Sequence, residues 1–170
     1  LKRLIPSYRI SQRTIFGGKI IFISKEHLNL FFGLPYEKEV WKSISKLVCL
    51  NPEEKILDIG ANIGQAMLAL HKIFPENNID SFEPQLKEFS FLQLNRVTNC
   101  VPGTSYNLAL TSKNVKSVNF ELDTETGGRA SAITDKATVN STAVHADRLK
   151  SYITPNVGLI KIDIETQTQI

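Results

Sequence analysis

The chain has 170 residues, of which 42% are hydrophobic and 22% are charged, and these proportions are typical of one globular domain rather than two. Its formal net charge of +3, from 20 Lys and Arg against 17 Asp and Glu, is too small to indicate nucleic-acid binding. Neither a zinc site nor a membrane segment is expected, because the three His and two Cys lack the short spacings of metal ligands and no apolar run reaches the roughly 20 residues of a membrane span.

The first fifty residues predict an extension ahead of the main domain. A short strand is expected over 19–23, after a pair of glycines, and a helix over about 36–47. Apolar residues recur in this helix at spacings of three and four, with Trp41 beside them, and should form one apolar face: Val40, Ile44, Leu47 and Val48. We therefore divide the chain into an extension, 1–50, and a main domain, 51–170.

Strands and helices then alternate. The run 55–59 is typical of a strand buried on both faces, the helical pattern over 63–74 is stopped by Pro75, and 79–83 predicts a second strand. Pro84 is well placed to begin a helix that continues to about Asn95. The side chains expected to face the sheet from that helix are Leu86, Phe89, Leu92, and Val97 or Leu94.

Four further strands are expected over 105–110, 115–122, 139–145 and 159–164, with 124–131 as a polar loop or hairpin tip. Strand, helix, strand, helix, strand in this order predicts an α/β fold with a doubly wound parallel sheet.

The turn after the strand 55–59 carries the permissive residues Gly60, Asn62 and Gly64, with Ala61 between the first two. In an open α/β sheet the first such turn forms the floor of the ligand crevice. Gly60 allows a tight turn, Asn62 tolerates a left-handed backbone, and Gly64 should let the helix begin close to a ligand. The backbone N–H groups of this helix start are expected to point at that ligand.

The spacing and two acids indicate which ligand this is. Dinucleotide sites use glycines at i, i+2 and i+5, whereas here the permissive residues fall at i, i+2 and i+4. Asp58 suits a cationic amino group, such as that of the methionine part of S-adenosylmethionine. Glu83 ends the second strand, where a carboxylate accepts hydrogen bonds from ribose hydroxyls. The favoured cofactor is S-adenosylmethionine, and a nicotinamide-dependent dehydrogenase is the less favoured alternative.

A longer series of motifs supports this interpretation. Residues 55–65 (KILDIGANIGQ), 82–84 (FEP), 107–110 (NLAL) and 159–165 (LIKIDIE) resemble the ordered motifs of the FkbM-type methyltransferase family, and 127–131 and 147–149 resemble two lesser landmarks. The resemblance extends from about residue 36 onward. It implies a Rossmann-like class I methyltransferase sheet with an antiparallel hairpin insertion, and O-methylation of a sugar, glycan or natural-product hydroxyl.

The resemblance also implies roles for single residues. Asp58, Gly60, Asn62 and Gly64 would line the methionine end of the cofactor, and Glu83 its ribose. An apolar wall for the adenine would come from Leu108 and Ala109. Near the sulfonium and the acceptor, Asp163 is the candidate base or acceptor anchor, with Glu165 second; a buried Asp163 paired with Lys161 is the structural alternative.

The chain departs from the family after Glu165, where the expected glycine and second acid are replaced by Thr166 and Thr168. It also begins at Leu1 rather than Met, and the pattern of a secretory signal is absent. We therefore expect a C-terminally truncated fragment of a cytoplasmic enzyme whose acceptor is a small molecule or glycan. A non-catalytic remnant that serves as an interaction module is the alternative for the fragment.

Overall fold

In a computed structural model, residues 9–23, 34–122, 131–134 and 141–163 are described. The N-terminal part forms an antiparallel hairpin of β1 (Ile10–Ile15) and β2 (Gly18–Ile23), followed by α1 (Leu34–Leu47). The expected strand 19–23 and the helix are present, whereas β1 was not predicted. Its sequence is mostly polar, and it becomes a strand through pairing with β2.

The centre of the molecule is a four-stranded parallel sheet in the order β10-β3-β4-β5. Its strands are β3 (Lys55–Ile59), β4 (Ile79–Phe82), β5 (Ser105–Tyr106) and β10 (Val157–Ile162). Helix α2 (Gln65–Ile73) connects β3 to β4, and α3 (Leu86–Thr98) connects β4 to β5. The prediction of a Rossmann-like α/β fold with a parallel sheet is confirmed.

The strand order reverses direction beside β3. After β3 the chain adds β4 and β5 on one side, and it later returns to place β10 on the other side. In open α/β sheets the ligand crevice lies outside the carboxyl ends of the strands at such a reversal. Here that position is the junction between β3 and β10.

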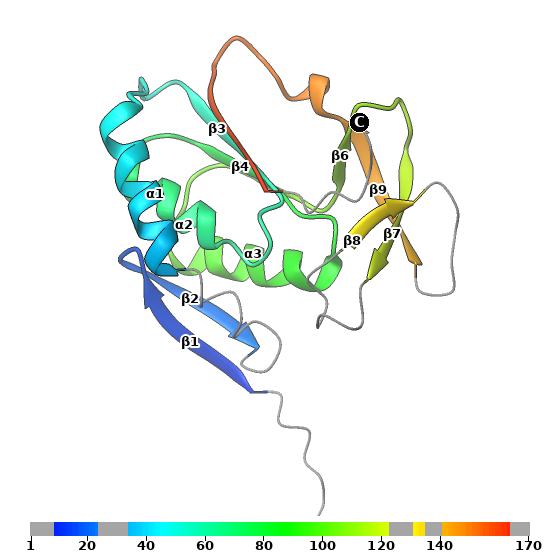
Figure 1. Cartoon of the computed structure of the whole chain (residues 1–170), viewed down its shortest axis with the longest axis horizontal. Coiled ribbons are helices and arrows are strands. Elements are labelled where there is room, and N and C mark those ends of the chain that lie inside the picture. The colour runs from blue at the N-terminus through cyan, green and yellow to red at the C-terminus, as the bar shows by residue number, and fades with distance from the viewer. Residues whose placement is uncertain (1–8, 24–33, 123–130, 135–140, 164–170) are drawn as a thin grey trace, which may run out of the picture.

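A second sheet lies beside the first and contains the expected antiparallel hairpin (Figure 1). Its order is β6-β9-β7-β8, formed by β6 (Ala109–Thr111), β7 (Ser117–Leu122), β8 (Ser131–Thr134) and β9 (Ser141–Arg148). Strand β7 pairs antiparallel with both β8 and β9, so the predicted antiparallel hairpin is present within it. A short 3-10 helix, η2 (Leu149–Ser151), leads from β9 toward β10.

The expected single strand 105–110 is wrong, because it divides into β5 in the parallel sheet and β6 in the second sheet. Asn107 lies between them, and its side-chain amide donates to the carbonyls of Glu83 and Pro84, each at 2.9 Å. The chain is thereby attached to the segment after β4 and then enters the second sheet.

The two faces of the parallel sheet pack differently. One face is covered by α1, α2, α3 and the hairpin, around a core that includes Ile56, Ile79 and Met67. The opposite face carries a smaller cluster in which Phe82 stacks on Tyr106 and contacts Tyr152 edge-on. In Figure 1, α2 and α3 lie between the β1–β2 hairpin and the sheet.

The predicted apolar face of α3 is partly wrong. Leu92 is buried and Phe89 is half-buried as expected, but Leu86 and Val97 are 69% and 73% exposed. Leu94 is also exposed, and the buried positions of α3 include two polar residues, Asn95 and Arg96. In α1 the half-buried Trp41 and Ile44 pack on the core, as does Val48 directly after the helix, whereas Val40 and Leu47 are exposed.

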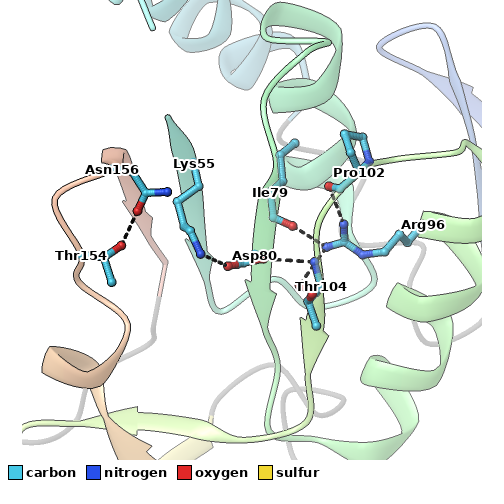
Figure 2. Close-up of polar contacts among 8 residues, drawn as sticks. All are labelled: Lys55, Ile79, Asp80, Arg96, Pro102, Thr104, Thr154 and Asn156. Atoms are coloured by element: carbon cyan, nitrogen blue, oxygen red, sulfur yellow. Dashed lines mark hydrogen bonds and ion pairs between the residues drawn. The ribbon is translucent and has the colours of Figure 1, made fainter. Parts of the chain in front are cut away.

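Arg96 is buried because backbone carbonyls surround it (Figure 2). Its guanidinium donates to the carbonyls of Ile79 at 2.9 Å and Pro102 at 3.0 Å, and to the hydroxyls of Ser81 and Ser105 at 3.0 and 2.7 Å. Burial lowers the pKa of Arg96, because the charged form is poorly solvated there. The hydrogen bonds attach α3 to β4 and β5, so this charge has a structural role.

Asn95 and Asn99 attach the same helix to the hairpin. The Asn95 amide accepts from the N–H of Ile21 at 2.7 Å and donates to its carbonyl at 3.1 Å. One turn later, Asn99 makes the same pair of bonds with Lys19, at 2.7 and 2.6 Å. These two side chains pair with the outer edge of β2 as a neighbouring strand would, which explains why α3 presents polar residues to the interior.

Candidate cofactor site

The glycine turn begins where β3 ends, at the carboxyl edge of the parallel sheet. Gly60, Asn62 and Gly64 have φ values of 75°, 50° and 98°, so the predicted left-handed position at Asn62 is present. The N–H groups of Gly60 and Ala61 both donate to the carbonyl of Phe82 at 3.0 Å. The turn therefore passes over the end of β4 and brings its backbone next to Glu83.

The amides of the turn, residues 60–64, donate within the protein. The prediction that amides of the helix start face a ligand concerns α2, which begins at Gln65, and it stays a prediction. Besides the two bonds to Phe82, the Asn62 amide donates to Glu83 Oε2 at 2.9 Å. The Ile63 amide donates to Asn62 Oδ1 at 2.7 Å, and the Gly64 amide to the carbonyl of Ala61 at 2.9 Å. Five successive amides thus have partners inside the protein, and one of these partners is a carboxylate.

The packing of the core also requires glycine at position 64. A Cβ at this position would lie 2.9 Å from Met67 Cε and 3.0 Å from Leu92 Cδ1, and the φ of 98° disfavours other residues. The close approach that needs glycine is therefore to the core between α2 and α3.

Glu83 directly follows β4 and is buried. Each carboxylate oxygen accepts one backbone hydrogen bond, Oε2 from Asn62 and Oε1 from Gln85, both at 2.9 Å. Burial raises the pKa of Glu83 to about 7, against the lowering effect of these two hydrogen bonds, and the nearby acids Glu88 and Asp58 add to the rise. The side chain is thus held in one orientation, and each oxygen keeps a further lone pair for a ligand hydroxyl.

Asn107 supports this arrangement and was not predicted as a site residue. Its two bonds to the carbonyls of Glu83 and Pro84 fix the backbone that carries the carboxylate. The sequence offered one signal, since Asn107 opens the motif 107–110. An asparagine at a strand end has many possible partners, however, so its partner is known only from the structure.

Asp58 is fully buried in β3, and β10 brings Lys161 beside it in the parallel register. Lys161 Nζ lies 3.1 Å from Asp58 Oδ1, although neither oxygen of Asp58 accepts a hydrogen bond within the described residues. The same ammonium donates to the carbonyl of Gly60 at 3.3 Å and lies 3.6 Å from Asp163 Oδ2. Lys161 was considered only as a partner of Asp163, so its contact with the turn was missed.

The other predicted residues are distributed around this edge. Asp163 follows β10, its backbone N–H donates to the carbonyl of Ile59 at 3.0 Å, and its side chain is 75% exposed. Leu108 packs in the cluster on the sheet face opposite the helices. Ala109 is buried in β6 of the second sheet. Glu165 and the landmark 127–130 lie outside the described residues.

Within the described ranges there is no group of three or more His, Cys, Asp or Glu residues that could hold a metal ion. No helix among these residues is long and apolar enough to cross a membrane.

No protein-family model matches the sequence, and no curated protein matches it. Among solved structures, the chain is similar to methyltransferase FkbM from Methylobacillus flagellatus KT, with 18% identity and a TM-score of 0.45, over 71% of this chain and 28% of that one.

Two further structures come from Pyrococcus horikoshii. A putative transferase has 17% identity and a TM-score of 0.40, over 63% of this chain and 44% of that one. TYW2 in complex with MeSAdo has 18% identity and a TM-score of 0.42, over 66% of this chain and 46% of that one. The chain thus spans less than half the length of each of the three proteins.

Proposed function

We propose that this chain is the cofactor-binding part of an S-adenosylmethionine-dependent methyltransferase of the FkbM type. One observation carries the proposal. At the carboxyl edge of the parallel sheet, beside the turn that follows β3, a buried carboxylate, Glu83, is held by an amide of that turn and by the amide of Gln85. A carboxylate fixed in this way can accept hydrogen bonds from the two hydroxyls of a ribose.

The partners of the turn amides argue against a dinucleotide. A pyrophosphate is bound by free backbone N–H groups at a helix start. Here the amides of residues 60–64 already donate within the protein, and the acceptor of the Asn62 amide is the carboxylate of Glu83. An anion beside this turn would repel phosphate. A nucleoside without phosphate, such as that of S-adenosylmethionine, is compatible with it.

For the methionine end of the cofactor, the pair of Asp58 and Lys161 offers one charge of each sign beside the turn. A zwitterionic amino acid carries an ammonium and a carboxylate. Asp58 has the charge to pair with the ammonium, and Lys161 has the charge to pair with the carboxylate. Neither oxygen of Asp58 accepts a hydrogen bond from the part of the chain that the structure describes, so the carboxylate has unused acceptor capacity.

When bound, S-adenosylmethionine supplies a methyl group on a cationic sulfur, so the protein has to orient the acceptor and remove its proton. We assign proton removal from a sugar, glycan or natural-product hydroxyl to Asp163, whose exposed carboxylate follows β10 at the same edge of the sheet. Glu165 is the second candidate for this role.

Calorimetry with S-adenosylhomocysteine tests the cofactor assignment. Glu83→Ala removes the carboxylate that would accept both ribose hydroxyls, so we expect affinity to fall about 100-fold. Glu76→Ala is the matched control, because Glu76 is an exposed acid in the turn before β4. Equal binding by Glu83→Ala and the unmodified chain would contradict the assignment. Binding of NADH in place of S-adenosylhomocysteine, followed by its fluorescence, would support the dehydrogenase alternative.

A further inference from the structure

Lys161 lies among three oxygen acceptors that belong to three different segments. Its ammonium is 3.1 Å from Asp58 Oδ1 in β3, 3.3 Å from the carbonyl of Gly60 in the turn, and 3.6 Å from Asp163 Oδ2 after β10. The contact with the Gly60 carbonyl is a hydrogen bond, and the two contacts with carboxylates are ion pairs. Only 19% of the side chain is exposed, which indicates a fixed internal position rather than a surface ion pair.

The contact with Gly60 completes a clamp on one peptide group. The peptide that joins Gly60 to Ala61 donates its N–H to the carbonyl of Phe82, which belongs to β4. The carbonyl of the same peptide accepts from Lys161, which belongs to β10. The two strands that flank β3 therefore hold opposite ends of this peptide, and its plane is fixed on both sides.

We propose that Lys161 is a positioning residue that holds the glycine turn from the β10 side and thereby sets the affinity of the cofactor site. This inference rests on the proposed function for the identity of the ligand. The role of Lys161 in holding the turn rests only on the contacts of the chain itself. Through Asp163, the same ammonium also connects the turn to the segment that carries the proposed base.

The positive charge of Lys161 stabilises the fold, in addition to the hydrogen bond that its side chain donates to the turn. Asp58 is fully buried, and within the described residues Lys161 is the cation at ion-pair distance from it. Removal of the lysine alone would leave a buried carboxylate without a counter-ion, which commonly destabilises the whole fold. Lys161→Met is therefore a poor test by itself, because weaker binding would follow from partial unfolding.

A pair of variants separates positioning from folding. Asp58→Asn removes the buried charge and serves as the matched background, and Asp58→Asn/Lys161→Met then removes only the lysine. We expect the double variant to bind S-adenosylhomocysteine about tenfold more weakly than Asp58→Asn, which is the effect of losing one hydrogen bond from a charged donor. Asp58→Asn/Lys161→Arg retains a donor of similar reach and should recover part of this affinity.

Amide hydrogen–deuterium exchange supplies a measurement that needs no ligand. We expect faster exchange of residues 60–64 in the double variant than in Asp58→Asn, with unchanged exchange in α3. Equal exchange in the two variants would overturn the positioning role, whether or not the cofactor binds. If the unmodified chain fails to bind S-adenosylhomocysteine while exchange of the turn responds to Lys161, the proposed function fails and the positioning role stands.

Discussion

The pH dependence of stability offers a direct measurement of the environment of Glu83. The carboxyl group has an ordinary pKa of 4.5 and a folded pKa of about 7, chiefly because it is buried. Glu83→Gln removes the ionisable group with little change in volume. Comparison of the two proteins across pH isolates the contribution of this one carboxyl group, because the other titrating groups are common to both.

The sign follows from proton binding. Between pH 4.5 and about 7 the folded protein keeps the Glu83 proton while the unfolded chain has released it, so folding takes up a proton. Stability from this group is fully present below the unfolded pKa and is lost as the pH rises through the folded pKa. The free energy of unfolding of the unmodified chain, relative to Glu83→Gln, should therefore fall with rising pH.

The magnitude follows from the same two pKa values. One pKa unit corresponds to about 1.36 kcal/mol, so the whole effect is about 3 kcal/mol, and most of it falls between about pH 5 and about pH 8. Urea denaturation at four pH values in this range gives the difference between the two proteins. Glu76→Gln, at an exposed acid, is the control for the loss of one negative charge. A difference that stays constant from pH 5 to pH 8 would refute the reasoning.

Three further predictions concern the framework of the site, and urea denaturation checks each. Gly64→Ala should lower the free energy of unfolding by about 1 to 3 kcal/mol, because the new Cβ meets the core at a positive φ; an unchanged midpoint would contradict this. Asn95→Ala should lower the free energy of unfolding by about 2 kcal/mol or more, because the backbone groups of Ile21 and the carbonyl of Ile63 lose their hydrogen-bond partner. Amide hydrogen exchange in β2 should also become faster, and exchange equal to that of the unmodified chain would contradict this prediction. Arg96→Met should destabilise by at least about 3 kcal/mol through the buried carbonyls it leaves unpaired, whereas the exposed Val97→Ala should be nearly neutral.

Much of the parallel sheet could be predicted because its signals are local. The apolar run of β3, the helical spacing before Pro75 and the glycine turn each depend on residues that are close in sequence. Strands β3 and β4 and helix α2 accordingly form within about two residues of their expected bounds. Where a strand owes its existence to pairing, as β1 does, its own sequence carries little signal.

Polar residues in the interior account for the main differences. Periodicity assigned the apolar residues Leu86 and Val97 to the buried face of α3, yet Asn95 and Arg96 lie there instead. The backbone of β2, the carbonyl of Ile79 in β4 and the carbonyl of Pro102 before β5 need hydrogen-bond partners at these positions. Such a need depends on which distant strand lies alongside the helix, and no local pattern encodes it.

The candidate site likewise has features that the sequence predicts and contacts that only the structure shows. The sequence by itself determined the glycine turn, the acid in β3 and the acid after β4, because chain order and strand ends place them at one edge of a parallel sheet. Only the tertiary structure decided that Glu83 holds the turn through the Asn62 amide, that Asn107 fixes its backbone, and that Lys161 joins Asp58 to Gly60. These contacts join residues 21 to 103 positions apart, and they exist because parallel strands from distant parts of the chain end side by side.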